Sequence, residues 1–239
     1  MFRISSNRKV FKRFLKPRSR TPAPTQREPV KLKEKKETSI LIQNEYGMDI
    51  SLSSPAIAYI CPNTKQLHLW FLNHVRKSRK SVGAQKQIVF HPIEMKYGET
   101  KNYASQEDYL AEMAPKLLEQ VRPNGSVRIE DYIYHANNSQ AVTILAETSG
   151  VIKFLMKRQN PGRTIHRVNT KTVKKFFGGD GRADKYKMYK EFDRWFPEWS
   201  AIVQTYFKWK FNPVDSNQTI PHPIEDIVDA IGLLDTNNV

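Results

Sequence analysis

The segment VRIEDYIYHANNSQAVTILAETSGVIK, residues 127–153, combines the two sequence patterns that decide the fold. Polar and apolar residues alternate from Val127 into Glu130, and β-favouring residues continue to Tyr134, which is typical of a strand. After possible capping residues at 137–139, apolar side chains recur at helical spacing up to residue 156, which predicts an amphipathic helix. A strand that carries an acidic residue therefore leads directly into a long helix.

Glu130 is one of four acidic residues in similar settings. A carboxylate in an apolar strand is costly to bury, so Glu130 either faces solvent, pairs with a cation or binds a metal. Asp49 lies in an expected strand that a turn joins to a return strand, all within residues 46–60. Asp226 and Asp229 lie one turn apart in a helix expected at 222–234, where both can reach one target.

Four segments in this order resemble the RuvC family of Holliday junction resolvases, within the RNase H-like nucleases. They are GMDISLSSPAIAYI at 47–60, the segment at 127–153, VNTKTVKKFFGGDGRADKY at 168–186 and IEDIVDAIGLL at 224–234. The resemblance covers most of residues 45–234 and implies an α/β fold, an RNase H-like mixed five-stranded sheet flanked by helices. It also implies that Asp49, Glu130, Asp226 and Asp229 are the catalytic carboxylates, and that Lys185 is a catalytic basic residue near the scissile phosphate.

Such a carboxylate set predicts bound metal. Four acids in one pocket repel one another strongly, so the cluster persists mainly when divalent cations neutralise it. Oxygen-only ligands favour Mg²⁺ or Mn²⁺ over zinc, and two such ions about 4 Å apart can promote phosphodiester hydrolysis. We therefore expect the four carboxylates to bind two Mg²⁺ ions, with Mn²⁺ as a possible substitute. The resemblance implies products with a 5′-phosphate and a 3′-hydroxyl.

Two further acids adjoin this set and are the alternatives for its positions. Asp131 follows Glu130, and successive side chains of a strand face opposite sides, so Asp131 should face away from Glu130. Glu225 precedes Asp226 and should point about 100° away from it on a regular helix.

The chain is strongly basic, which predicts a polyanionic partner, most plausibly nucleic acid. Its formal charge is +15 over 239 residues. A glycine-containing loop before an expected helix start, at 178–185, could hold a phosphate on helix amides, with cations beside it. A second basic loop, at 76–86, could follow a DNA backbone or be a solvated surface loop. The candidate DNA-binding residues are Lys174, Lys175, Arg182 and Lys185, together with Arg76, Lys77, Arg79 and Lys80.

Residues 1–38 differ in composition from the rest, and we expect them to form a disordered basic arm before a nuclease domain at 39–239. The arm has 13 Lys or Arg and 3 Glu, a net charge of 13 − 3 = +10, and four prolines. It could attract phosphates, be a plain solvated tail, or be a transit segment within its first twenty residues. We expect a cytoplasmic location, in the host if the source is a phage or virus, or the mitochondrial or plastid matrix if a transit segment is present.

Several other segments extend this scheme. Alternation predicts a strand at 66–75, followed by an apolar run at 88–90. Ser105 begins an expected helix that reaches about residue 121, in which Pro115 predicts a kink or a late start. A short strand is expected at 164–168 and a helix at 169–178. The aromatic residues between 188 and 211 either stack on bases or, more simply, cover the sheet or a dimer contact.

The helix expected at 139–157 bears on the oligomeric state. In the resolvase family the corresponding helix forms a two-fold dimer, so the resemblance implies a homodimer. Ala146, Ser149 and Gly150 offer a small-residue face for a second copy, whereas the simpler interpretation is packing on the protein's own sheet.

We therefore expect a structure-selective, metal-dependent endodeoxyribonuclease that resolves four-way (Holliday) DNA junctions in recombination, repair or debranching. One alternative is an RNase H-like nuclease that acts on RNA–DNA hybrids or flaps; another is a non-catalytic basic protein that binds DNA junctions. The basic arm, the long gap between Asp49 and Glu130 and the expanded segment 187–222 favour a phage, viral or organellar branch.

The single Cys61 excludes an internal disulfide. No apolar run approaches the ~20 residues that span a bilayer, so no membrane partner is expected.

Overall fold

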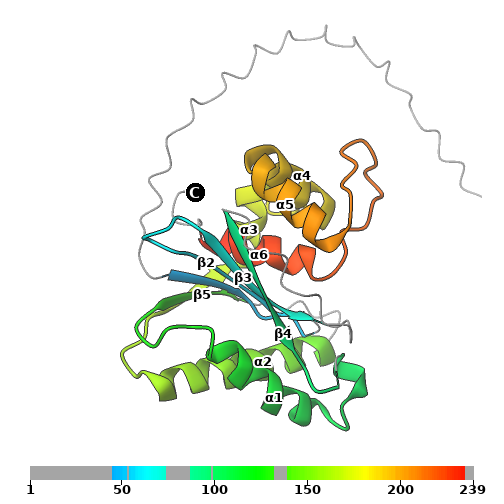
Figure 1. Ribbon diagram of the computed structural model, residues 1–239. Coiled ribbons are helices and arrows are strands. Elements are labelled where there is room, and N and C mark those ends of the chain that lie inside the picture. The colour runs from blue at the N-terminus through cyan, green and yellow to red at the C-terminus, as the bar shows by residue number, and fades with distance from the viewer. Residues whose placement is uncertain (1–44, 53, 74–86, 98, 132–138, 235–239) are drawn as a thin grey trace, which may run out of the picture. The chain divides into compact units, whose positions relative to one another are not determined.

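A mixed six-stranded sheet forms the centre of the computed structural model, which describes residues 45–52, 54–73, 87–97, 99–131 and 139–234 (Figure 1). The strands run in the order β4-β3-β2-β1-β5-β6. Their bounds are β1 Glu45–Asp49, β2 Ala56–Ile60, β3 Leu67–Asn73, β4 Ile88–Glu94, β5 Ser126–Asp131 and β6 Ile165–Asn169. β1, β2 and β3 are antiparallel neighbours, whereas β1, β5 and β6 are parallel. The expected α/β fold, a mixed sheet flanked by helices, is confirmed.

One strand was missing from the expected sheet. The apolar run at 88–90 belongs to a seven-residue strand, β4, which pairs in parallel with β3 and makes six strands instead of five. β4 contains Pro92, which an edge strand tolerates because one of its sides has no neighbouring strand to receive a hydrogen bond.

Helices cover both faces of the sheet (Figure 1). Their bounds are α1 Gln106–Leu118, α2 Ser139–Gln159, α3 Thr170–Gly178, α4 Lys185–Trp195, α5 Pro197–Phe207 and α6 Ile224–Leu234, with a short 3₁₀ helix, η1, at Thr100–Asn102. α1 and α2 pack on one face, where Met48, Ile57 and Ile129 are fully buried, and α3 to α6 pack on the other. Two separate apolar clusters result, one on each side of the sheet.

The helix starts follow their capping residues. Ser105 accepts a hydrogen bond from the backbone N–H of Asp108 at 3.1 Å and caps α1 as expected. α1 begins at once and continues through Pro115, so the expected late start is wrong. α2 occupies the range predicted for the long helix, and none of the described helices is both long and apolar enough to cross a membrane.

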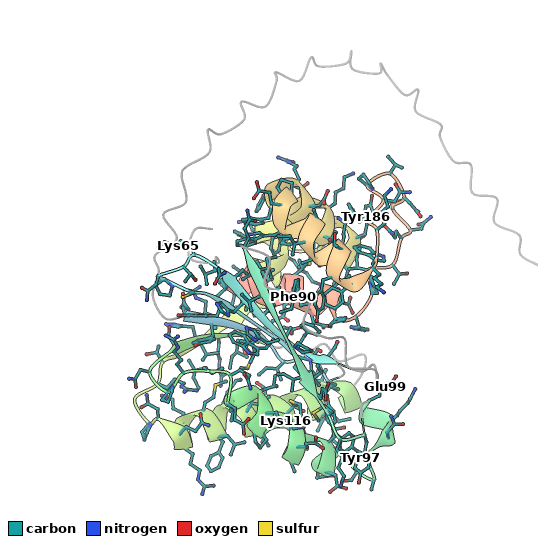
Figure 2. The ribbon with its side chains drawn as sticks, in the orientation of Figure 1. Lys65, Phe90, Tyr97, Glu99, Lys116 and Tyr186 are labelled. Atoms are coloured by element: carbon teal, nitrogen blue, oxygen red, sulfur yellow. The ribbon has the colours of Figure 1, made fainter. Side chains whose placement is uncertain are left out.

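The aromatic residues at 188–211 belong mainly to the core. Most of them lie on the helices α4 and α5, and Tyr206 stacks on Phe90 of β4 with ring centroids 3.9 Å apart. Phe90 lies between the sheet and these helices (Figure 2). Tyr189 and Phe192 are fully buried. The interpretation that these residues cover the sheet therefore accounts for most of them.

α6 crosses the sheet at Gly47, which brings two acidic elements together. A Cβ atom at Gly47 would lie 2.1 Å from the backbone oxygen of Ala230, so only glycine permits this close approach. β1 ends at Asp49, two residues after Gly47, and Ala230 directly follows Asp229. The backbone contact therefore sets the distance between β1 and the carboxylates of α6.

Candidate functional site

Asp49 lies at the centre of the candidate site, on the sheet face that α6 covers. Tyr46 and Met48 belong to the apolar cluster under α1 and α2, so the alternating Gly47 and Asp49 face α6. In the parallel pairing of β1 with β5, Met48 lies opposite Ile129. The next position of each strand is an acid, and Asp49 and Glu130 therefore lie side by side on this face.

The helix α6 adds two carboxylates to the same face of the sheet. Asp226 and Asp229 are separated by one turn, and both are buried against the sheet. Asp226 accepts a hydrogen bond from the Ser54 hydroxyl, which belongs to the turn between β1 and β2. Asp49 interacts electrostatically with Asp229, Asp226 and Glu130, which means that all four predicted carboxylates share one site.

Lys185 is the cation nearest to these carboxylates among the described residues. It is the first residue of α4, and its Nζ forms an ion pair with Asp229. Burial alone would lower the pKa of Lys185, but the charges of Asp229, Asp49 and Glu225 outweigh burial and raise it. Lys185 therefore remains charged and offsets part of the negative charge of the cluster.

The remaining negative charge is not fully compensated by the described part of the protein. Burial raises the pKa of Asp49 well above its ordinary value, and the charges of Asp229, Asp226 and Glu130 raise it further. Burial also raises the pKa of Asp229 and of Glu130, although Lys185 opposes both shifts. Asp49 is 4 % exposed, and its carboxylate makes no hydrogen bond or ion pair within the described part of the chain.

This donor set suits a hard divalent cation. All four predicted ligands offer carboxylate oxygens, which Mg²⁺ and Mn²⁺ favour, and Asp49 is a buried carboxylate that a cation would neutralise. The residues present therefore fit the expected metal.

The predicted DNA-binding residues differ in where they lie. Lys174, on α3, is close enough to Glu130 to oppose the rise in the pKa of that carboxyl. Lys175 and Arg182 are exposed, and neither forms an ion pair with a described residue. Arg76, Lys77, Arg79 and Lys80 lie outside the described residues, as does the proposed basic arm at 1–38.

Two backbone amides near the predicted phosphate site at 178–185 are paired with acidic side chains of the same loop. Asp184 caps α4, and its carboxylate accepts a hydrogen bond from the backbone N–H of Lys187 at 2.7 Å. The side chain of Asp180 likewise accepts from the backbone N–H of Arg182 at 3.1 Å. These two amides are therefore not free for a phosphate, and a phosphate site on the rest of the loop stays a prediction.

The two alternative acids take different places. Asp131 faces the α2 side, where it lies 3.9 Å from Arg167 and interacts with Lys153 of α2. It therefore points away from Glu130, as expected. Glu225 stands at the edge of the site instead, because its Oε1 lies 2.8 Å from Nδ1 of His222 and its charge reaches Lys185 and Asp229.

Two residues of this region, Ser54 and His222, were not predicted. The place of Glu225 at the edge of the site was not predicted either. His222 lies four residues before Asp226, a spacing that could have indicated a shared helix face. Ser54 joins the site across 172 positions of sequence, and no local pattern indicates such a contact.

The surface of α2 departs from the predicted small-residue face. Ser149 is buried at 3 % exposure and packs on the protein's own core, so its assignment to a dimer face is wrong. Gly150 is exposed, and a Cβ atom added to it would have nothing within 4 Å among the described residues. Beside it lie two exposed apolar side chains, Val151 and the 65 % exposed Phe154.

The strand order and the acidic cluster define an α/β protein with a mixed sheet and a carboxylate site on one sheet face. No family model and no curated protein matches the chain. Among solved structures, it is similar to RuvC from Thermus thermophilus, with 14% identity, 80% of this chain and 90% of that chain covered, and a TM-score of 0.37. For Thermus thermophilus RuvC in complex with a Holliday junction substrate, the identity is 13%, the coverage 81% and 92%, and the TM-score 0.40. It is also similar to the yeast mitochondrial Holliday junction resolvase Ydc2, with 12% identity, 82% of this chain and 77% of that chain covered, and a TM-score of 0.42.

Proposed function

We propose that this chain is a metal-dependent endodeoxyribonuclease that resolves four-way DNA junctions by hydrolysis of phosphodiester bonds. The observation that carries the proposal is the convergence of Asp49, Glu130, Asp226 and Asp229 on one face of the sheet, with Lys185 beside them. A purely structural cluster of buried acids would be costly without cations, whereas a nuclease that binds divalent metal needs this donor set.

The four carboxylates would hold two Mg²⁺ ions, and Mn²⁺ could substitute. When bound, these ions supply Lewis-acid stabilisation of phosphate oxygens and activate water for hydrolysis. Lys185 is available to stabilise negative charge on the phosphate, because its side chain remains 43% exposed while its Nζ contacts Asp229. Lys174 adds a second positive charge next to Glu130.

The basic charge of the chain and the exposed apolar surface of α2 support a branched DNA substrate. The net charge of +15 favours DNA, and much of it lies in the basic arm. A symmetric cut across a four-way junction requires two sites, which a homodimer provides. We assign the dimer contact to the exposed part of α2, where Phe154 and Val151 adjoin the open surface at Gly150.

The test is cleavage of an immobile four-way DNA junction in Mg²⁺ by the wild type and by the variants Asp49→Asn and Asp229→Asn. Asp131→Asn is the matched control, because this acid is adjacent in sequence to Glu130 but faces α2. We expect paired symmetric nicks in the wild type and the control, and none in the two site variants, with junction binding retained.

Duplex, flap and RNA–DNA hybrid substrates separate this proposal from its alternatives. If only the hybrid or the flap were cut, the proposed metal site would be retained, but the proposed substrate would be wrong. Binding of the junction without cutting in either Mg²⁺ or Mn²⁺ would contradict the enzyme and favour a DNA-binding protein.

A further inference from the structure

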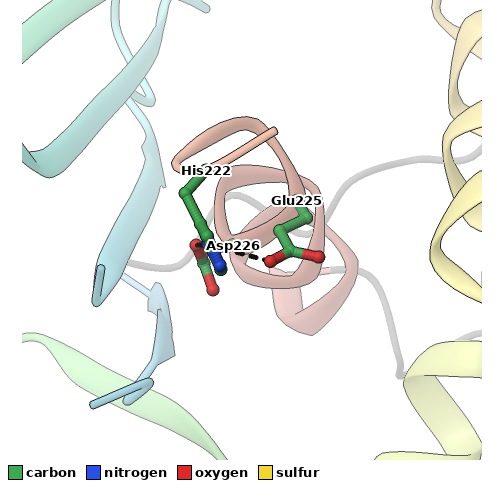
Figure 3. A group of neighbouring side chains, drawn as sticks. All are labelled: His222, Glu225 and Asp226. Atoms are coloured by element: carbon green, nitrogen blue, oxygen red, sulfur yellow. Dashed lines mark hydrogen bonds and ion pairs between the residues drawn. The ribbon is translucent and has the colours of Figure 1, made fainter. Parts of the chain in front are cut away.

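His222 lies two residues before α6, where three oxygen atoms lie close to one of its ring nitrogens. Figure 3 shows two of the three groups, the carboxylates of Glu225 and Asp226. Nδ1 of His222 is 2.8 Å from Oε1 of Glu225, 2.9 Å from Oδ2 of Asp226 and 3.0 Å from Oγ of Ser54. Ser54 and Asp226 are also hydrogen-bonded to each other. Four polar groups from two parts of the chain therefore converge on one point.

Hydrogen bonds alone satisfy this arrangement poorly. An imidazole nitrogen carries either one hydrogen or one lone pair, so Nδ1 can donate to only one of the three oxygens at a time. A cation that accepts lone pairs from the nitrogen and the oxygens together would satisfy all of them. The separations fit such an ion, because neighbouring ligands of a six-coordinate ion with bonds of about 2.1 Å lie about 3.0 Å apart.

A second observation points to a cation at this end of the cluster. Asp49 is 4 % exposed, and its carboxylate has no hydrogen-bond or ion-pair partner among residues 45–52, 54–73, 87–97, 99–131 and 139–234. It interacts electrostatically with Asp226, while the one ion pair that Lys185 forms within these ranges is made with Asp229. The described residues therefore leave the carboxylates on the Asp226 side without a permanent cation.

We propose that His222 binds a divalent cation through Nδ1, together with Asp226 and Glu225, at the outer end of the carboxylate cluster. The inference rests on the proposed function, because Asp226 belongs to the set that would hold the catalytic ions. A nitrogen donor in an otherwise oxygen site favours transition metals, so this position binds Mn²⁺ in preference to Mg²⁺.

The experiment measures Mn²⁺ binding to the full chain without DNA, by electron paramagnetic resonance, so that it does not depend on cleavage. The chain has six histidines, and labelling them with nitrogen-15 makes a direct bond between Mn²⁺ and an imidazole visible as a hyperfine coupling. The variants are His222→Ala and His222→Gln, and the matched control is His166→Ala, which removes an exposed histidine of β6. Glutamine can still donate a hydrogen bond to Asp226 but lacks the imidazole donor.

The wild type and His166→Ala should show the histidine coupling, and both His222 variants should lose it. The Mn²⁺ affinity of the His222 variants should fall by at least about ten-fold, which is the size of loss that even outer-shell partners cause, and the Mg²⁺ affinity should fall less. Circular dichroism verifies that each variant is folded, and the glutamine variant separates loss of the ligand from loss of the hydrogen bond.

Two results would overturn the inference, and they differ in what they say of the proposed function. Unchanged Mn²⁺ affinity in both His222 variants, with no coupling in the wild type, would make His222 a positioning residue for Asp226. If Asp49→Asn then abolished Mn²⁺ binding, the metal site of the proposed nuclease would stand. Absence of any Mn²⁺ binding by the wild type would overturn both.

Discussion

The substitution Gly47→Ala tests whether the backbone contact between β1 and α6 sets the geometry of the site. The added Cβ would lie 2.1 Å from the Ala230 oxygen, whereas real contacts of this kind essentially never fall below 3.0 Å. β1 and α6 must therefore separate there by at least 3.0 − 2.1 = 0.9 Å, which moves Asp226 and Asp229 relative to Asp49. We expect a loss of stability of about 1–3 kcal/mol from overpacking. Cleavage should fall about a hundred-fold, the cost of a misplacement of about 1 Å.

Urea unfolding, Mn²⁺ affinity and junction cleavage measure the three consequences separately. Gly162→Ala is the matched control, because the nearest atom to its new Cβ, Oδ1 of Asn160, would lie at an ordinary 3.4 Å. The control should resemble the wild type in all three assays. Wild-type stability and metal affinity in Gly47→Ala would refute the reasoning, since α6 would then not be held against β1 by this contact.

Two further predictions follow from the charge of the site and from the surface of α2. Burial, and then Asp229, Asp226 and Glu130, raise the pKa of Asp49 above 3.8, so the native state retains a proton that the unfolded chain has released. The free energy of unfolding of the metal-free protein should therefore fall as pH rises from about 4 through the raised pKa. In EDTA near neutral pH, Asp49→Asn should then be more stable than the wild type to urea; an equally steep fall in both proteins would contradict this. Phe154→Asp should convert the proposed dimer into a monomer in analytical ultracentrifugation, whereas Val214→Asp, at an 88% exposed loop position, should not. A wild-type monomer would remove the dimer from the proposal.

Local patterns predicted most of the fold because its central elements carry strong periodicity. The alternation around Glu130, the long apolar stripe of α2 and the apolar face of α6 each identify their element without tertiary information. β4 was missed because its apolar run is short and its partner, β3, is chosen by tertiary packing. Pro92 also weakens the local strand pattern, and its place at a sheet edge cannot be inferred from neighbouring residues.

The candidate site was predictable where its residues sit on these periodic elements. Asp49, Glu130, Asp226 and Asp229 were placed by strand alternation and helix spacing together with the family resemblance, although their roles remain proposals. The predicted phosphate site stays a prediction, because the same loop that resembles a phosphate cradle also supplies Asp184, which caps α4 itself. Ser54 enters through a contact between distant segments and has no local signal.

The division of the core into two unconnected apolar clusters has an evolutionary consequence. Asp49 and the helix α6 belong to one layer, whereas α1 and the exposed Phe154 of α2 belong to the other. Mutations in either layer meet different neighbours, and effects of residues without shared partners tend to add. A lineage could therefore change its partner surface, or lose it, while its chemistry is preserved, and the same separation lets an engineer alter assembly and metal preference one at a time.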